Sequence, residues 1–94
     1  MAPDTDALIE ELAQPGDRDT LEEALTRGYA QALSLEAERM RLDRRITALA
    51  AGLAADGARV TEVAELARRR RHADGELTRL REALLLLRTR LRSV

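Results

Sequence analysis

The sequence predicts an all-α fold: an antiparallel helical hairpin in which two long helices pair as a coiled coil. Three observations predict it. Apolar residues recur every third and fourth position in two long stretches, one short turn sequence separates them, and both patterns share a register about that turn. Composition agrees, because 35% of the 94 residues are charged and only 1% are aromatic, which suits long helices better than a compact globular core.

The more regular pattern ends at the last residue of the chain. Its positions alternate three and four residues apart without a slip, as the a and d positions of a coiled coil do. They are Val63, Leu66, Arg70, Ala73, Leu77, Leu80, Leu84, Leu87, Leu91 and Val94. Gly75 falls inside this stretch but on its outward face, and the pattern continues in phase on either side. One continuous helix over about 60–93 is therefore favoured over a break at Gly75.

The first long helix is predicted over about 20–52. Its start, Thr20-Leu21-Glu22-Glu23, matches a capping box, in which the hydroxyl and the later carboxylate each accept a backbone N–H. Its stripe alternates in the same way and consists of Leu21, Leu25, Gly28, Ala32, Leu35, Arg39, Leu42, Ile46, Leu49 and Leu53. Asp56-Gly57 predicts a turn at about 54–58. Antiparallel pairing with residue numbers summing to 112 then places stripe residues of both helices opposite one another, for example Gly28 opposite Leu84.

Two regions follow from this pattern: a hairpin over 20–94 and an N-terminal arm over 1–19. The arm contains a short helical segment over about 7–13, capped by Asp4 or a neighbour and stopped by Pro15-Gly16. Seven or eight residues are too few for an independent helix. The arm therefore either docks on the hairpin or serves as a detachable helix that binds in the groove of a partner.

Two arginines interrupt the stripes. Arg39 and Arg70 fall in adjacent middle layers, one from each long helix. A guanidinium among leucines needs a carboxylate, water or a ligand, because an unpaired buried charge is very costly. The carboxylates near enough in sequence are Glu36, Glu38, Asp43 and Asp74. The arginines predict either a polar layer that fixes the register or a site for a small anionic ligand such as a nucleotide.

Large apolar residues remain after both stripes are used. They are Tyr29, Leu33, Met40, Leu85 and Leu86. A two-helix hairpin offers only one shared seam, so these residues predict an interface that either forms a homodimer with a four-helix-bundle core or binds a protein partner. The alternative is that Ile9 and Leu12 of the arm cover them.

Several functions are not expected. The net charge is −1, and the four arginines of 68–71 spread around a helix between acidic residues, so nucleic-acid binding is not predicted. With no Cys and only His72 as histidine, no metal or other cofactor is predicted. The chain has no apolar run long enough for a membrane span and no recognisable signal peptide, which predicts a cytoplasmic protein. All basic residues are arginine, a hint of a GC-rich bacterial genome.

Two resemblances bear on function. The hairpin plan and the seam arginines resemble the small actinobacterial anti-sigma factors that bind cyclic dinucleotides on a coiled coil. The serine-arginine-glutamine-aspartate series of that family does not occur here at matching spacing, so no residue role is transferred. In length, the chain resembles small all-helical chorismate mutases, which bind a dicarboxylate with arginines. The resemblance implies that Arg39 and Arg70 of this chain would bind the dicarboxylate. Those enzymes also use a lysine, which this chain lacks.

The function predicted is a non-enzymatic interaction module that acts as a scaffold, adaptor or regulator. A ligand-responsive regulatory hairpin, similar to an anti-sigma factor, is the alternative, and a chorismate-mutase-like enzyme is a distant third.

Overall fold

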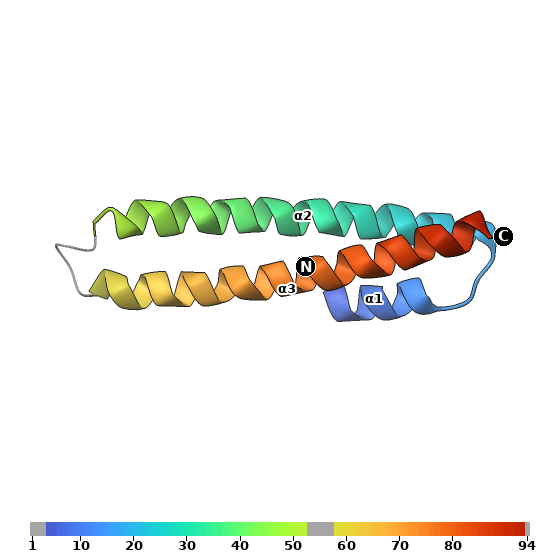
Figure 1. Ribbon diagram of the computed structural model, residues 1–94, viewed down its shortest axis with the longest axis horizontal. Coiled ribbons are helices and arrows are strands. Elements are labelled where there is room, and N and C mark those ends of the chain that lie inside the picture. The colour runs from blue at the N-terminus through green and yellow to red at the C-terminus, as the bar shows by residue number, and fades with distance from the viewer. Residues whose placement is uncertain (1–3, 53–57, 94) are drawn as a thin grey trace.

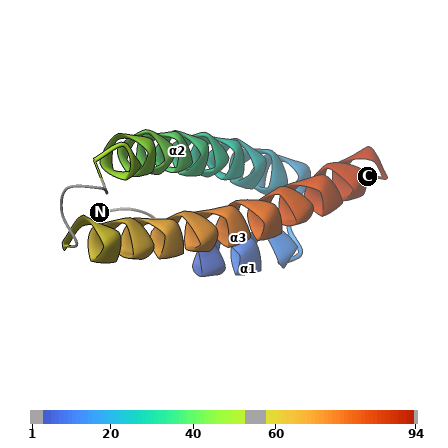
Figure 2. The ribbon, with the colours of Figure 1, turned by 60° about the vertical axis from the view of Figure 1, so that its left-hand side comes forward.

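The computed structural model describes residues 4–52 and 58–93, which form three α-helices: α1 (Thr5–Ala13), α2 (Arg18–Ala50) and α3 (Ala58–Arg92) (Figure 1). No strand occurs among the described residues, so the predicted all-α class is confirmed. Helices α2 and α3 lie side by side in opposite directions as a hairpin (Figures 1 and 2), and the molecule as a whole measures 59 × 20 × 18 Å. The predicted turn lies outside the described residues, except for its last residue, which begins α3.

Helix α2 begins two residues earlier than the sequence pattern suggests. Asp17 is its N-cap, and the carboxylate accepts a hydrogen bond from the backbone N–H of Thr20 over 2.8 Å. The expectation that Thr20 caps the helix is wrong, because Asp17 already satisfies an amide of the first turn. This hydrogen bond from Thr20 lowers the pKa of Asp17 below its ordinary value, so the cap is ionised at neutral pH.

Helix α3 is unbroken through Gly75. Gly75 is exposed, and a Cβ atom at this position would meet no other atom within 4 Å. The expectation of one continuous helix is therefore confirmed.

The hydrophobic core lies in the half of the hairpin that contains the C-terminus, called the open end here (Figure 1). Leu80 and Leu87 of α3 are fully buried there, and Gly28 of α2 lies against Leu84, its predicted partner. Burial of one leucine contributes about 1.5–3 kcal/mol. The core cluster consists of Leu8, Leu12, Leu21, Ala24, Ala32, Leu35, Leu77, Leu80, Leu84, Leu87 and Leu91. Toward the turn, stripe residues such as Ile46 and Val63 are only half-buried, so packing stabilises the open end most.

Helix α1 docks on the open end, where it runs beside α3 and opposite in direction to α2 (Figures 1 and 2). Its Leu8 and Leu12 are buried in the shared core. A helix of nine residues is not stable alone in water, so the helical state of α1 depends on this docking. The arm is therefore docked on the hairpin, which is the first of the two arrangements that the sequence allows for it. None of the helices, over the residues described, has the length and apolarity required to cross a membrane.

Candidate functional site

An apolar groove lies between α2 and α3 at the open end. Helix α2 contributes Tyr29 and Leu33, which are one turn apart, and α3 contributes Leu85. The buried residues Ala32 and Leu84 lie between them, and the groove has a volume of about 580 Å³. All residues that line it belong to α2 and α3, so α1 does not cover this groove.

The three large side chains of this groove are strongly exposed. The exposed fractions are 41% for Tyr29, 67% for Leu33 and 62% for Leu85. Isolated exposed leucines are common, but large apolar side chains gathered around one groove mark surfaces that other molecules cover. We call the surface formed by Tyr29, Leu33 and Leu85 the apolar face.

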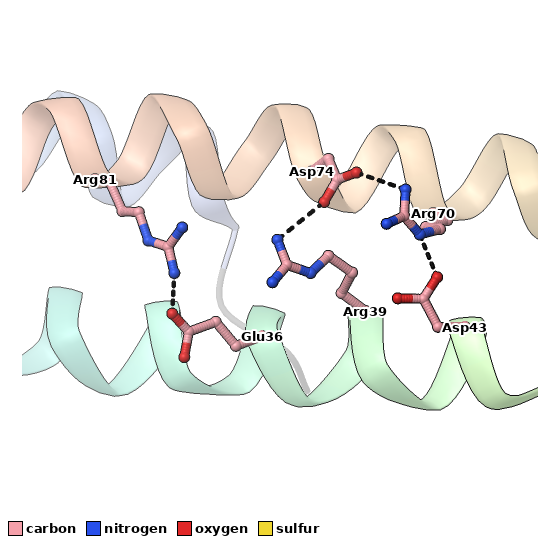
Figure 3. A network of polar contacts seen from close by, with 6 residues as sticks. All are labelled: Glu36, Arg39, Asp43, Arg70, Asp74 and Arg81. Atoms are coloured by element: carbon pink, nitrogen blue, oxygen red, sulfur yellow. Dashed lines mark hydrogen bonds and ion pairs between the residues drawn. The ribbon is translucent and has the colours of Figure 1, made fainter.

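Charged residues border the apolar face along the hairpin axis. Glu36 of α2 accepts a hydrogen bond from Arg81 of α3, and this pair crosses the groove on the side toward the turn (Figure 3). Arg88 lines the groove one helical turn beyond Leu85, toward the C-terminus. The face is therefore apolar at its centre and charged at both ends.

The structure does not bring together all five residues that the sequence predicts as an interface. Leu86 is 66% exposed but lines a separate cavity with Ile9 of α1, because consecutive helical residues point about 100° apart. Met40 is exposed on α2 seven residues beyond Leu33, outside the groove. Leu12 of the arm is buried near Gly28 instead of covering the apolar face.

The two seam arginines pair with carboxylates (Figure 3). Arg39 Nη1 lies 3.3 Å from Asp74 Oδ1, and Arg70 Nη1 lies 3.0 Å from Asp74 Oδ2. Arg70 also donates from Nε to Asp43. Of the four carboxylates that the sequence offers as partners, Asp43 and Asp74 bind the seam arginines. Glu36 binds Arg81 instead.

This network limits what the seam arginines can do chemically. The hydrogen bond to Asp43 and the charge of Asp74 raise the pKa of Arg70, so its guanidinium stays charged. Two positive groups face two negative groups, so an incoming anion would have to displace a carboxylate. The side chains are only partly buried, which also allows water to solvate them. The arrangement suits a polar layer, while anion binding stays a prediction.

The contacts that hold α1 were not anticipated from the sequence. Gln31 Nε2 donates to Thr5 Oγ1 over 3.0 Å, and both residues are buried. Arg27 of α2 binds both carboxylate oxygens of Glu11 through its two Nη atoms. Ala24 and Gln31 lie one helical turn before and after Gly28 of the main stripe, which signals that some element covers this side of α2 but does not say which one.

Helix α3 holds the same arm with two arginines. Arg79 Nη1 lies 2.8 Å from Asp6 Oδ1 near the start of α1. At its other end, Arg90 donates to the carbonyl oxygens of Leu12 and Gln14, both over 2.9 Å. Carbonyl groups in the last turn of a helix lack partners within the helix, so Arg90 satisfies them.

The arginine run and His72 form a solvated belt. Arg68 and Arg69 both pair with Glu65 of the same helix, and His72 Nε2 lies 2.6 Å from Glu76 Oε1. His72 is exposed. Within residues 4–52 and 58–93, no three histidine or acidic side chains gather in a way that could hold a metal ion.

Comparison with known proteins gives no relative for this arrangement. No family model matches the chain, and neither the curated proteins nor the solved structures contain a match.

Proposed function

We propose that the chain is a non-enzymatic coiled-coil interaction module that acts by covering its apolar face with a second copy of itself. The observation that carries this proposal is the grouping of Tyr29, Leu33 and Leu85 around one groove that α1 leaves open. Burying these side chains in a dimer gives the hydrophobic gain that a single hairpin cannot obtain. The product is a four-helix-bundle core built from two α2–α3 pairs.

The charges at the ends of the apolar face favour a second copy as the occupant. In a two-fold symmetric dimer whose axis runs across the helices, the two copies are antiparallel, so the end with Arg88 meets the end with Glu36 and Arg81. Arg88 of one copy can then share Glu36 of the other. In this arrangement Arg88 meets the Glu36–Arg81 ion pair of the other copy at both ends, while the leucines meet at the centre.

A different protein with a matching apolar helix could cover the same face, and the module would then act as an adaptor or regulator. This form of the proposal uses the same three residues. The cytoplasmic setting stays a prediction from the sequence pattern, and the bacterial setting stays a prediction from the use of arginine alone.

A pair of neighbouring leucines provides the test. Leu85→Glu places a charge in the centre of the apolar face, and Leu86→Glu places the same charge on an equally exposed residue outside it. We expect Leu85→Glu to lower the assembly mass in light scattering to that of one chain, because the charge would be buried without a partner. Leu86→Glu should retain the wild-type mass.

Circular dichroism of both variants controls for folding, since exposed substitutions of this kind leave the helices largely intact. If the wild-type protein is a dimer and Leu85→Glu has the same assembly mass, the interface must lie elsewhere. Equal loss of mass in both variants would contradict the assignment to this groove.

A further inference from the structure

We propose that the two copies pack antiparallel in one defined register, with Leu33 of each copy level with Leu85 of the other; this inference rests on the proposed self-association. The dimer is then a rod whose two turn halves project at opposite ends. The turn half consists of the described residues 43–52 and 58–69, at the opposite end of the hairpin from the open end (Figure 1).

The groove of the apolar face has the same spacing of side chains on both helices. On α2 and on α3 alike, three of the side chains that line it follow one another at intervals of four and then three residues. Each α2 residue differs in number by 52 from its α3 counterpart, and the pairs are Tyr29 with Arg81, Leu33 with Leu85, and Glu36 with Arg88.

This constant difference defines the register of an antiparallel dimer. Within one chain, α2 and α3 run in opposite directions, so the numbers of level residues have a constant sum, and the contact of Gly28 with Leu84 agrees with a sum of 112. Reversal of the second copy turns the constant sum into a constant difference. A two-fold axis that crosses the hairpin near Ala30 therefore makes all three pairs level at once.

The central layers of this dimer bury the leucines of the apolar face. Leu33 is 67% exposed and Leu85 is 62% exposed in the single chain. Because each lies level with the other residue type of the second copy, both layers are filled by large apolar side chains, and neither leucine faces a charge.

The outer layers give the charged groups partners. Arg88 forms no ion pair within the part of the chain that the structure describes. In this register it lies level with Glu36 of the other copy, whose carboxylate has two oxygens and is able to accept from a second arginine. Tyr29 lies level with Arg81 of the other copy, and a guanidinium interacts favourably with the face of an aromatic ring.

A parallel dimer is less favourable. A two-fold axis along the helices places every residue level with itself, so Arg88 of one copy faces Arg88 of the other and the like charges repel. The turn halves would also lie side by side, where Arg70 already pairs with Asp43 in each chain and gains no new partner.

The register also determines the shape of the dimer. The axis near Ala30 lies in the open end, so the two copies overlap along their open ends and the turn halves lie beyond the overlap. Two identical polar ends then point in opposite directions, which suits a scaffold that holds two bound partners apart.

A distance measurement between two spin labels tests orientation and register together. The chain has no cysteine, so Ala48→Cys, at an exposed position in the turn half, provides one labelling site per chain. At ~1.5 Å per residue, the proposed register places the two nitroxide labels about 55 Å apart in double electron–electron resonance. A parallel dimer would place them within about 30 Å, because neighbouring helices in a bundle lie about 8–10 Å apart.

The mass of the labelled protein separates the possible failures. A mass of one chain in light scattering would overturn the proposed function and this inference with it. A dimer whose labels lie within about 30 Å would overturn only the antiparallel orientation. An intermediate distance would overturn the register, because a shift of the axis by one residue moves the labels by about 3 Å. Addition of Leu85→Glu should abolish the distance, and addition of Leu86→Glu should retain it.

Arg88→Ala tests the charged layer separately. We expect the dissociation constant of the dimer to rise about 2- to 5-fold, because an ion pair at the rim of the interface is lost. Arg44→Ala is the matched control, since Arg44 is exposed in the turn half, beyond the overlap, and should leave the constant unchanged. A tighter dimer for Arg88→Ala would show that two arginines face each other and would overturn the antiparallel orientation.

Discussion

At the scale of single residues, the two glycines inside the long helices have opposite roles. Gly28 is buried and lies against Leu84, so its missing side chain lets α2 and α3 approach each other closely. Gly75 lies in open solvent on α3 and has no packing role. Both lower helix propensity, but only Gly28 has a structural reason for being glycine.

Replacement of each glycine by alanine therefore gives opposite results. Gly75→Ala should stabilise the protein by about 1 kcal/mol, which is the difference in helix propensity. Gly28→Ala should be destabilising. It gains the same helix propensity of about 1 kcal/mol, but overpacking in a core typically costs about 1–3 kcal/mol and outweighs that gain. Urea unfolding followed by circular dichroism measures both. Stabilisation by Gly28→Ala equal to that of Gly75→Ala would show that the close approach at Leu84 is unimportant.

The seam arginines illustrate what residue patterns can and cannot predict. Their place in adjacent layers follows from the spacing, and two of the four candidate carboxylates do bind them. The choice among the four could not be predicted, because all lie within reach of a long, flexible guanidinium. Asp74 binds both arginines, while Glu36 is taken by Arg81.

At the scale of helices, α1 depends on the hairpin through both packing and charge. Arg27 donates two hydrogen bonds to Glu11 and thereby holds the pKa of that carboxyl below its ordinary value. A carboxyl with a lowered pKa in the folded state contributes stability above its unfolded pKa. This contribution is lost as the pH falls through the lowered value. The docking of α1 should therefore weaken in acid.

An NMR titration of the Leu12 methyl groups tests this expectation. In the wild type, we expect the signals to shift toward those of an exposed leucine as the pH falls below the ordinary pKa of a glutamic acid. Glu11→Gln should reduce that pH dependence. Glu65→Gln is a matched control, because the pKa of Glu65 is also lowered, by Arg68, but at a site remote from α1. If Glu65→Gln had the larger effect, the role given to Glu11 would be wrong.

The hairpin could be predicted from the sequence because α2 and α3 carry strict and matching periods. The contact of Gly28 with Leu84 agrees with the predicted register. The position of α1 could not be predicted, because its two anchoring leucines fit several surfaces. Its docking also explains why Ala24 and Gln31, which lie outside the main stripe, are buried. The cap at Asp17 was missed because Thr20 offered an equally good local pattern.

At the scale of the whole molecule, the hairpin has two flanks that differ in how they are covered. One flank carries α1 (Figure 2), and the apolar face lies on α2 and α3 where no residue of α1 lines the groove. The sequence predicts excess apolar residues at the open end, but it could not assign them to flanks, since it does not show which side of the hairpin α1 covers. The three-dimensional arrangement separates them and reduces the proposed interface to Tyr29, Leu33 and Leu85.

Native mass spectrometry of the unmodified full-length protein tests the central claim most directly. The account predicts an assembly with the mass of two chains and no added small molecule, because the second copy covers the apolar face and carboxylates already neutralise the seam arginines. The mass of one chain at all protein concentrations would contradict self-association. A single chain with the added mass of a bound anion would instead assign the function to Arg39 and Arg70.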